Sequence, residues 1–525
     1  MAQAPRAIVV GGGIGGLTAA VALHRSGWRV TVLERARSLE PVGAGISLAP
    51  NSLRAFDVIG LGDEIRDLAA WQGDGGLRTP GGRWLSRGSA AGVATRFGGP
   101  LVLLHRATLV GSLVARLPAG CVRTGAPATL VDQGDPGVPG RPARVATPGG
   151  ELEAELVVGA DGLRSAVRPV LFPAHPGPVY SGFTTWRIVV PVPGVPFAAH
   201  ETWGRGRIWG THPMKDGRVY AYAAARVPAG GRAADDELAE LVRLFGDWHE
   251  PVPDVLAAAR PEDVLRHDVH HIAEPLPAFH AGRVALVGDA AHAMPPTLGQ
   301  GGNQAIEDAI VLAHHVDPVR LADADPRVRR GGPAVADAEP AAADADSYPP
   351  HRPGHLGPPA TGGDPLSRHT GPPATGADPD TRHGGRASAD PDPYPRHAGG
   401  VSADPDPHHA GPSHRQAGQA SAGPDPFGPG VGAYVPSGGP HAMGDALAAY
   451  SADRRPRTTA IARKAVSAAR LNMVRGRLVT ALRDAAVATV STAAPAVLLR
   501  SFDGIADWRP PRSPYASDGT RADTP

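Results

Sequence analysis

The chain has 525 residues, and its 52 Lys and Arg against 51 Asp and Glu leave no basic excess that would draw it onto nucleic acid. The 68 glycines and 57 prolines approach the composition of disordered proteins, so we expect part of the length to be unfolded. Cys121 is the only cysteine, which excludes an intramolecular disulfide and a thiolate metal cluster.

The first residues, MAQAPRAIVVGGG, lack the charged and then apolar segments of a signal peptide. No run of about 18 apolar residues follows anywhere in the chain. We therefore expect a cytoplasmic protein without a membrane span.

The chain opens with the pattern of a strand, a glycine turn, a helix and a second strand. Residues 7–10 are apolar, residues 14–26 have helical spacing, and residues 29–34 alternate as a strand does. Such a βαβ opening is typical of dinucleotide-binding folds.

The turn in this opening reads Gly11-x-Gly13-x-x-Gly16. Gly11 would make the tight turn, Gly13 would let backbone approach a pyrophosphate, and Gly16 would let helix and strand pack closely. Glu34, followed by Arg35, ends the second strand, where an acid accepts hydrogen bonds from ribose hydroxyls. The motif predicts a dinucleotide site and does not separate FAD from NAD.

Four later motifs add to this opening: GAGISLAPN at 43–51, LHRATLVGSLV at 104–114, ELVVGADGLRSAVRPVL at 155–171 and GDAAHAMPPTLGQGGNQAIEDA at 288–309. Together the motifs resemble the single-component FAD-dependent aromatic hydroxylases, the monooxygenase family typified by para-hydroxybenzoate hydroxylase. The motif sequences most resemble those of the branch that contains the salicylate, 3-hydroxybenzoate and urate hydroxylases. The resemblance covers residues 5–316 and 443–500.

The resemblance implies a cofactor role for each motif. The glycine turn and Glu34 would hold the ADP half of FAD, and Arg106 would contact the pyrophosphate or ribityl chain. Asp161 and Gly162 would serve both FAD and NAD(P)H, and Asp289 would hold the ribityl region. The expected cofactor-binding residues are Gly11, Gly13, Gly16, Glu34, Arg35, Arg106, Asp161, Gly162, Asp289, Pro296, Gly299, Gly301, Gly302 and Asn303.

The 288–309 stretch concentrates acids, amides and a histidine before a helical pattern. A helix starting near residues 301–303 would aim free backbone N–H groups at the flavin, an effect worth a few tenths to about 2 kcal/mol. We expect His292 to support the loop through a backbone hydrogen bond. Glu307 and Asp308 are expected on or just below the helix surface, because adjacent helix residues do not share a face. No metal site is expected.

Residues 176–275 consist of short alternating runs between Pro and Gly, as in an antiparallel sheet. In this family the substrate domain lies here. Period two puts Tyr220 and Tyr222 on one face, and it puts Arg207 and His212 on opposite faces of their strand. We expect the catalytic candidates to be Arg207, His212 and Tyr222, with exposed sheet positions as the alternative.

Residues 317–442 are rich in Pro, Gly, Ala, Asp and His, and we expect this insert to be disordered. PPATGGDP at residue 358 recurs as PPATGADP at residue 372, a polar repeat that does not suit a solenoid. Helical spacing returns at 443–500, and a flexible tail is expected at 501–525.

These observations predict an α/β fold. A Rossmann-like FAD-binding domain of the GR2 type would carry an inserted antiparallel β-sheet substrate domain, C-terminal helices and the long disordered insert. The FAD-binding domain would comprise residues 1–175 and 276–316, with 71–100 contributing to the substrate-side sheet, and the substrate domain would comprise residues 176–275.

The resemblance implies a monooxygenase in which NADH or NADPH reduces FAD, O₂ forms a flavin C4a-hydroperoxide, and a small aromatic or phenolic substrate is hydroxylated. One alternative is an FAD-dependent epoxidase, reductase or dehydrogenase on the same scaffold. Another is a non-catalytic scaffold that uses the insert. We expect a monomer or homodimer.

Overall fold

The structure is a computed structural model, and its described residues all fall within the unit that comprises 1–334 and 431–525. The described residues are 4–39, 44–192, 197–323, 442–494, 497, 500 and 502–511. The repeats at 358 and 372, and most of the expected insert, lie outside them. Within the described part of the chain, no helix combines the length and apolarity that a membrane crossing requires.

A six-stranded sheet lies at the centre of the nucleotide-binding half. Its strands follow the order β18 (His280–Ala281), β19 (Val284–Leu286), β12 (Leu156–Gly159), β1 (Arg6–Val10), β2 (Arg29–Leu33) and β8 (Val122–Arg123). All pairs are parallel except β18 with β19. Both faces of the central strands are buried, which explains their continuous apolar sequences.

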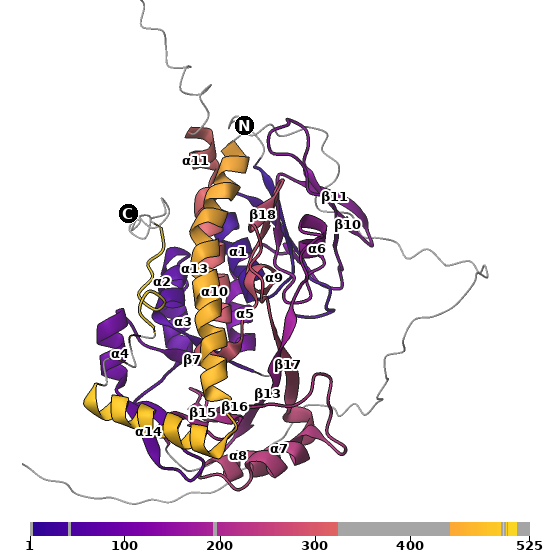
Figure 1. Ribbon diagram of the computed structural model, residues 1–525. Helices are drawn as coiled ribbons and strands as arrows, with labels where there is room; N and C mark the ends of the chain where they lie inside the picture. Colours follow the sequence, from indigo (N-terminus) through magenta and orange to yellow (C-terminus); the bar gives the residue numbers. More distant parts are fainter. Residues whose placement is uncertain are drawn as a thin grey trace, which may run out of the picture. The chain divides into compact units, whose positions relative to one another are not determined.

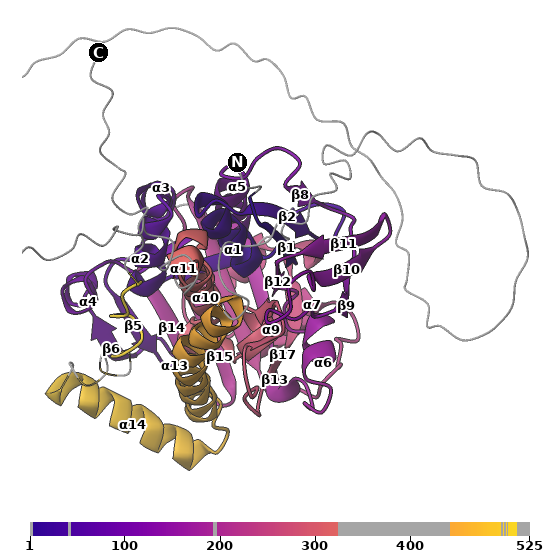
Figure 2. The same cartoon turned by 90° about the horizontal axis from the view of Figure 1, so that it is seen from above.

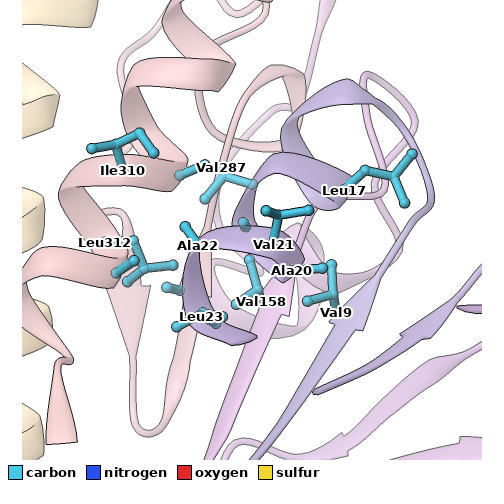
Figure 3. Packing of buried hydrophobic residues seen from close by; sticks show 14 of the residues in the cluster. Val9, Leu17, Ala20, Val21, Ala22, Leu23, Val158, Val287, Ile310 and Leu312 are labelled. Carbon is cyan, nitrogen blue, oxygen red and sulfur yellow. The ribbon is translucent and has the colours of Figure 1, made fainter. Parts of the chain in front are cut away.

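Helix α1 (Ile14–Arg25) packs between this sheet and helix α10 (Gly301–His315). A Cβ on Gly15 would lie 3.1 Å from the Cβ of Ala305, so a glycine permits the close approach of the two helices. Figure 3 shows the resulting contact layer, with labelled side chains from both helices and the strands: Val9, Leu17, Ala20, Val21, Ala22, Leu23, Val158, Val287, Ile310 and Leu312.

Smaller elements surround this core. One three-stranded sheet has the order β11 (Gly150–Ala154), β10 (Ala143–Thr147) and β9 (Thr129–Asp132), and another has β3 (Gly45–Leu48), β7 (Val102–His105) and β4 (Ala70–Trp71). The accompanying helices are α2 (Pro50–Val58), α3 (Gly62–Leu68), α4 (Ala90–Phe97), α5 (Arg106–Val114), α6 (Val167–Leu171), α9 (Asp289–His292) and the 3-10 turn η2 (Pro296–Leu298).

A seven-stranded sheet forms the second layer of the molecule. Its order is β17 (Leu265–His271), β13 (Val179–Pro191), β16 (Arg218–Ala225), β15 (Arg207–Pro213), β14 (Ala199–Trp203), β5 (Gly75–Arg78) and β6 (Trp84–Gly88). Only β14 and β5 pair in parallel, so strands from residues 75–88 extend an otherwise antiparallel sheet.

One face of this sheet is covered by helices α7 (Glu237–Phe245) and α8 (Val252–Ala258), which the 3-10 turn η1 (Pro261–Asp263) follows. Figure 1 shows both helices against the strands. The side chains sealed between helices and sheet include Trp186, Ile188, Trp209 and Phe245. Trp186 therefore has a packing role.

Helix α13 (Ala442–Asn472) runs alongside α10, as Figures 1 and 2 both show, and α14 (Arg477–Ala493) packs against β6. Helix α10 ends at its C-cap Val316.

Two expectations of disorder are wrong at their edges. Residues Pro318–Asp323 form helix α11, because the Asp317 carboxylate accepts a hydrogen bond from the Val319 N–H and Leu321 is buried in the core. Residues 502–511 are also ordered: Ile505 is buried, and Arg54 donates to the Trp508 carbonyl at 2.8 Å.

Candidate active site

The glycine turn has the geometry that a bound pyrophosphate needs. Gly11 has a φ of 109°, and a Cβ there would lie 2.3 Å from the Ala160 carbonyl oxygen. A Cβ on Gly16 would lie 2.1 Å from the Gly11 carbonyl oxygen, so both positions require glycine. A Cβ on Gly13, in contrast, would meet no atom within 4 Å. Gly13 therefore borders open space at the start of α1.

The polar groups around this opening also fit a dinucleotide. Helix α1 has no side-chain hydrogen bond at its N-cap, so its first N–H groups remain free for phosphate oxygens. Glu34 faces the turn, because its carboxylate accepts hydrogen bonds from the Gly12 and Ala36 N–H groups, each at 2.7 Å. The neighbouring Arg35 is exposed.

Asp161 offers a second test of the fit. Its Oδ2 accepts hydrogen bonds from the N–H groups of Ala166 and Val167, whereas its buried Oδ1 has no partner among the described residues. Buried polar atoms are rarely left unpaired, so an unsatisfied oxygen here is consistent with a ligand contact. Gly162 beside it has a φ of 78°, which favours glycine.

Arg106 and Asp289 lie close together between the two sheets. Surrounding protein desolvates the Asp289 carboxyl and thereby raises its pKa, although part of the residue stays accessible to solvent. The positive charges of His292, Arg106 and Arg187 lower the same pKa. Burial likewise lowers the pKa of Arg106, with Arg187 as a second cause. Arg106 of α5, Asp289 of α9 and Arg187 of β13 together form the charged wall of the site.

The loop from Pro296 to Gly302 leads into α10. Gly299 has a φ of 61° and borders open space, and a Cβ on Gly301 would lie 3.9 Å from the Asp289 carboxylate. The α10 N-cap Gln300 makes no side-chain capping bond, so N–H groups of the first turn remain available to an anionic or carbonyl ligand. Gly302 packs against Ile46 of β3.

The Asn303 side chain is fully used within the protein. Its Oδ1 accepts hydrogen bonds from the Ala49 N–H and the Ser52 hydroxyl, and its Nδ2 donates to the Ser47 and Gly299 carbonyls. Asn303 therefore fixes the loop against β3 and α2, and only its backbone N–H could contact a cofactor.

Two expectations for the same stretch are wrong. Glu307 and Asp308 are fully buried, because arginines from α13 reach them: Arg454 donates to both carboxylates, and Arg457 donates to Glu307. His292 bonds the Asp308 carboxylate at 2.6 Å and not a backbone group. Burial opposes ionisation of Asp308, but His292 and Arg454 outweigh it and hold its pKa at about 2. This ion network therefore positions the segment from Gly288 to His292 against α10.

The sheet face opposite α7 and α8 carries half-buried polar side chains in cross-strand rows. In one row Arg187 of β13 pairs with Tyr222 of β16, Tyr222 with Gly210 of β15, and Gly210 with Glu201 of β14. The adjacent row contains Val189, Tyr220 and His212. Paired residues of adjacent strands share a face, so these side chains lie together.

This face is directed toward the nucleotide-binding half. A Cβ on Gly45 of β3 would lie 2.6 Å from the Tyr220 ring, and Tyr220 packs with Leu103 of β7. Arg187 is close enough to Arg106 to lower the pKa of that guanidinium. The polar rows of the sheet and the charged wall therefore face a common region.

The three catalytic candidates do not all lie in this region. Tyr222 donates a hydrogen bond to Glu201 at 2.5 Å, and His212 stacks on Tyr222 with ring centroids 5.7 Å apart. Burial lowers the pKa of His212 to about 4, so it is neutral at pH 7. Arg207 lies on the other face, where it donates to the Leu244 carbonyl of α7. The structure does not bring Arg207 together with the other two.

Sequence reasoning missed Glu201 altogether and left Arg187 without a role. The signal for Glu201 was its place in HETWG, where period two puts the acid and Trp203 on one face of a predicted strand. Only the pairing of β14 with β15 reveals that this face is the one occupied by Tyr222.

The fold and this arrangement define the chain as a dinucleotide-binding α/β protein with a β-sheet that faces the nucleotide site. Residues 5–326 match the family model described as FAD binding domain. The chain belongs to this family.

Two relatives specify the class of enzyme. The Aurachin C monooxygenase/isomerase of Stigmatella aurantiaca is 38% identical over 308 residues, which span 58% of this chain and 79% of that protein. The 3-amino-4-hydroxybenzoate 2-monooxygenase of Streptomyces platensis is 36% identical over 346 residues, 63% of this chain and 82% of that protein. The expectation of an FAD-dependent monooxygenase is thereby confirmed.

The fold has a solved counterpart. The crystal structure of Klebsiella pneumoniae HpxO complexed with FAD and uric acid aligns with a TM-score of 0.64, covering 96% of each chain at 22% identity. This similarity confirms the expected α/β architecture.

Proposed function

We propose that the enzyme uses FAD, NADH or NADPH, and O₂ to hydroxylate a small, electron-rich aromatic ring that carries an acidic group. The observation that supports this substrate class is the row of half-buried polar side chains, with the Arg187 cation at one end and the Glu201–Tyr222 pair at the other. The aromatic acid named in the Streptomyces relative and the uric acid bound to HpxO belong to the same class.

We assign the cofactor to the glycine turn, Glu34, Arg106, Asp161 and Asp289. Bound FAD would accept a hydride from the nicotinamide donor and supply the activated oxygen. The first turn of α10 would stabilise negative charge on the ring system through its free N–H groups. The ion network around Asp308 would hold that turn in place during turnover.

We assign the substrate to the polar sheet face. Among the described residues Arg187 joins no salt bridge, so its charge is available to an anionic group of a ligand. Tyr220 and Val189 would provide the aromatic and apolar walls of the site. Arg207 is left out of this assignment because it lies on the opposite face. A cytoplasmic location, a monomeric or homodimeric state and the domain limits stay predictions.

A substrate screen tests the proposal. The FAD-loaded enzyme is mixed with NADH or NADPH and with hydroxybenzoates, aminohydroxybenzoates, purines and hydroxylated N-heteroaromatics, and products are identified by mass spectrometry. We expect at least one ring to stimulate NAD(P)H oxidation and to gain one oxygen atom. Stimulated oxidation that returns all O₂ as H₂O₂ with every ring would support a reductase or oxidase instead.

A matched pair of variants tests the substrate assignment. Replacing Arg187 with Gln should raise KM for an anionic substrate by about tenfold to a hundredfold, since a charge-assisted contact is worth about 1.5–3 kcal/mol. Replacing Arg207 with Gln removes a cation from the other face of the same sheet and should leave KM close to the wild-type value. Equal effects of the two changes would contradict the assignment.

A further inference from the structure

Helix α14 directs its charged side chains toward the protein. Among residues 478–493 the charged side chains are Arg483 and Asp484, which pair at 2.8 Å and are only 2% and 13% exposed. The Arg483 guanidinium also donates to the carbonyls of Gly204 and Asn472. The polar side of α14 thus faces the protein, which is the reverse of an ordinary surface helix.

The opposite side of α14, which we call its outer face, is uncharged and mostly apolar. Its members recur at a spacing of three or four residues and are all exposed: Leu478, Ala481, Leu482, Ala485, Thr489 and Ala493. Leu478 is 73% exposed and Leu482 is 62% exposed. Figures 1 and 2 show α14 at the periphery of the unit, with the sheets and the other helices on one side of it. An apolar stripe that is held in this orientation marks an interaction surface.

Cations lie beside the outer face where α14 begins. Residues 454–483 contain nine Lys and Arg and no Asp or Glu. Arg470 near the end of α13, Arg475 in the connecting turn and Arg477 at the start of α14 are all exposed. None of these three forms an ion pair with an acid in the described part of the chain. The surface next to the leucines therefore carries uncompensated positive charge, which attracts an anionic partner.

We propose that the outer face of α14 docks on an anionic lipid surface. Leu478, Leu482 and the alanines would enter the boundary between headgroups and acyl chains, and the neighbouring arginines would contact lipid phosphates. Apolar burial and attraction to anionic headgroups add, so the two features together produce the binding. The enzyme would then lie on a membrane without spanning it. Binding of this kind does not depend on which substrate the enzyme hydroxylates.

A second copy of the chain is the alternative occupant, and both area and charge disfavour it. Helix α14 has 17 residues. At about 1.5 Å per residue it is about 25 Å long, so a face about 10 Å wide covers about 250 Å². A stable dimer buries about 800 Å² on each partner. Pairing across α14 would also bring two sets of arginines together, whereas anionic headgroups neutralise them.

Sedimentation of the FAD-loaded enzyme with vesicles tests the lipid assignment. One probe is a vesicle of phosphatidylcholine with one-third phosphatidylglycerol, and the other is a vesicle of phosphatidylcholine alone. The variant Leu478→Gln/Leu482→Gln removes the apolar contact. The variant Arg470→Gln/Arg477→Gln removes two of the cations.

The matched control is Leu68→Gln/Leu101→Gln. These two leucines are also exposed, at 41% and 37%, and they belong to α3 and to the segment before β7. The flavin content of all three variants should equal that of the wild type, because each substituted side chain is exposed. A change in vesicle binding then reports the surface and not the fold.

We expect the wild type and the control to bind the anionic vesicles, and to bind phosphatidylcholine alone at least about tenfold more weakly. The leucine variant should bind the anionic vesicles about a hundredfold more weakly than the wild type, since two leucine side chains no longer leave water. The arginine variant should lose about fivefold in binding for each cation removed.

Wild-type enzyme that stays in the supernatant with anionic vesicles would overturn the assignment. A leucine variant that binds like the wild type would also overturn it, because attraction between charges alone would then explain the binding. Sedimentation velocity without vesicles tests for the second copy: a dimer that the leucine substitutions dissociate would place another chain on α14 in place of lipid. We expect an association state that these substitutions do not change.

Discussion

Arg454 joins two buried carboxylates on adjacent positions of α10 to a helix that follows them by more than 140 residues. Its Nε lies 2.7 Å from Asp308, and its NH1 lies 2.6 Å from Glu307. The Asp308 carboxylate in turn accepts a hydrogen bond from the Gly288 N–H and bonds the His292 Nε2, which fixes the segment that precedes the 296–302 loop. Because every charge in this cluster has a partner, the loss of any one of them leaves an uncompensated buried ion.

Replacing Arg454 with Met should therefore destabilise the enzyme by about 3–5 kcal/mol. Urea unfolding of the FAD-loaded protein measures this change. The control is Arg96→Met, which removes an arginine from the exposed pair with Asp503 and should barely move the midpoint. A normal midpoint for Arg454→Met would mean that the network does not hold α10 against α13.

The same network predicts a pH dependence of stability. The pKa of Asp308 is depressed from 3.8 to about 2 in the folded protein, so its contribution is present above the unfolded value and is lost as the pH falls through the folded value. Unfolding free energy measured between pH 5 and pH 2 should fall less steeply for Asp308→Asn than for the wild type. Identical slopes would contradict the depressed pKa.

Gly210 offers a second test at the level of a single residue. Its replacement by Ala would place a methyl group 2.2 Å from the Tyr222 ring and displace the phenol from Glu201. Such overpacking costs about 1–3 kcal/mol, so the variant should unfold at a lower temperature than the wild type. Thermal unfolding of the FAD-loaded protein measures this change. An unchanged Tm would show that Tyr222 does not need its position over β15.

At the scale of elements, the turn between β1 and α1 separates positions that serve folding from a position that serves binding. Gly13→Leu should leave the fold intact, because a Cβ there meets no protein atom within 4 Å, yet it should fill the space expected for the pyrophosphate. We expect the purified variant to be colourless, with a Kd for FAD raised at least about tenfold. Gly11→Ala should instead lower the Tm of the apoprotein, since its Cβ would overlap the Ala160 carbonyl. Full flavin content in Gly13→Leu would place the cofactor elsewhere.

Two elements could be predicted because their signals are local. The Gly11-x-Gly13-x-x-Gly16 turn and the start of α10 near residues 301–303 depend on neighbouring residues, and the sequence indicates both correctly. The partners of Asp308 and Glu201 depend on residues far along the chain, such as Arg454, and on strand register. Helix periodicity predicts that two adjacent acids lie on the helix surface. It depends on local sequence alone, so it does not include the second helix, α13, that covers Glu307 and Asp308.

The whole molecule builds its site from segments on both sides of the insert. The cofactor and substrate residues lie between 11 and 303, and α13 supplies the arginines that hold α10. Helix α11 contacts α13, so the two ends of the connection lie side by side. Replacing residues 330–435 with a short Gly/Ser linker should therefore leave FAD content and hydroxylation rate within about twofold of the wild type, because loop closure depends weakly on length. A large loss of turnover at normal flavin content would mean that the replaced residues take part in catalysis.

At the scale of the reaction, we expect this enzyme to insert one atom of molecular oxygen into an aromatic ring. Incubation of the FAD-loaded enzyme with ¹⁸O₂, NAD(P)H and the best ring of the screen tests it most directly, with label in the product and NAD(P)H consumption measured together. We predict one ¹⁸O atom per product molecule and one NAD(P)H oxidised for each. Unlabelled product, or NAD(P)H oxidation with all ¹⁸O recovered as labelled H₂O₂, would contradict the account.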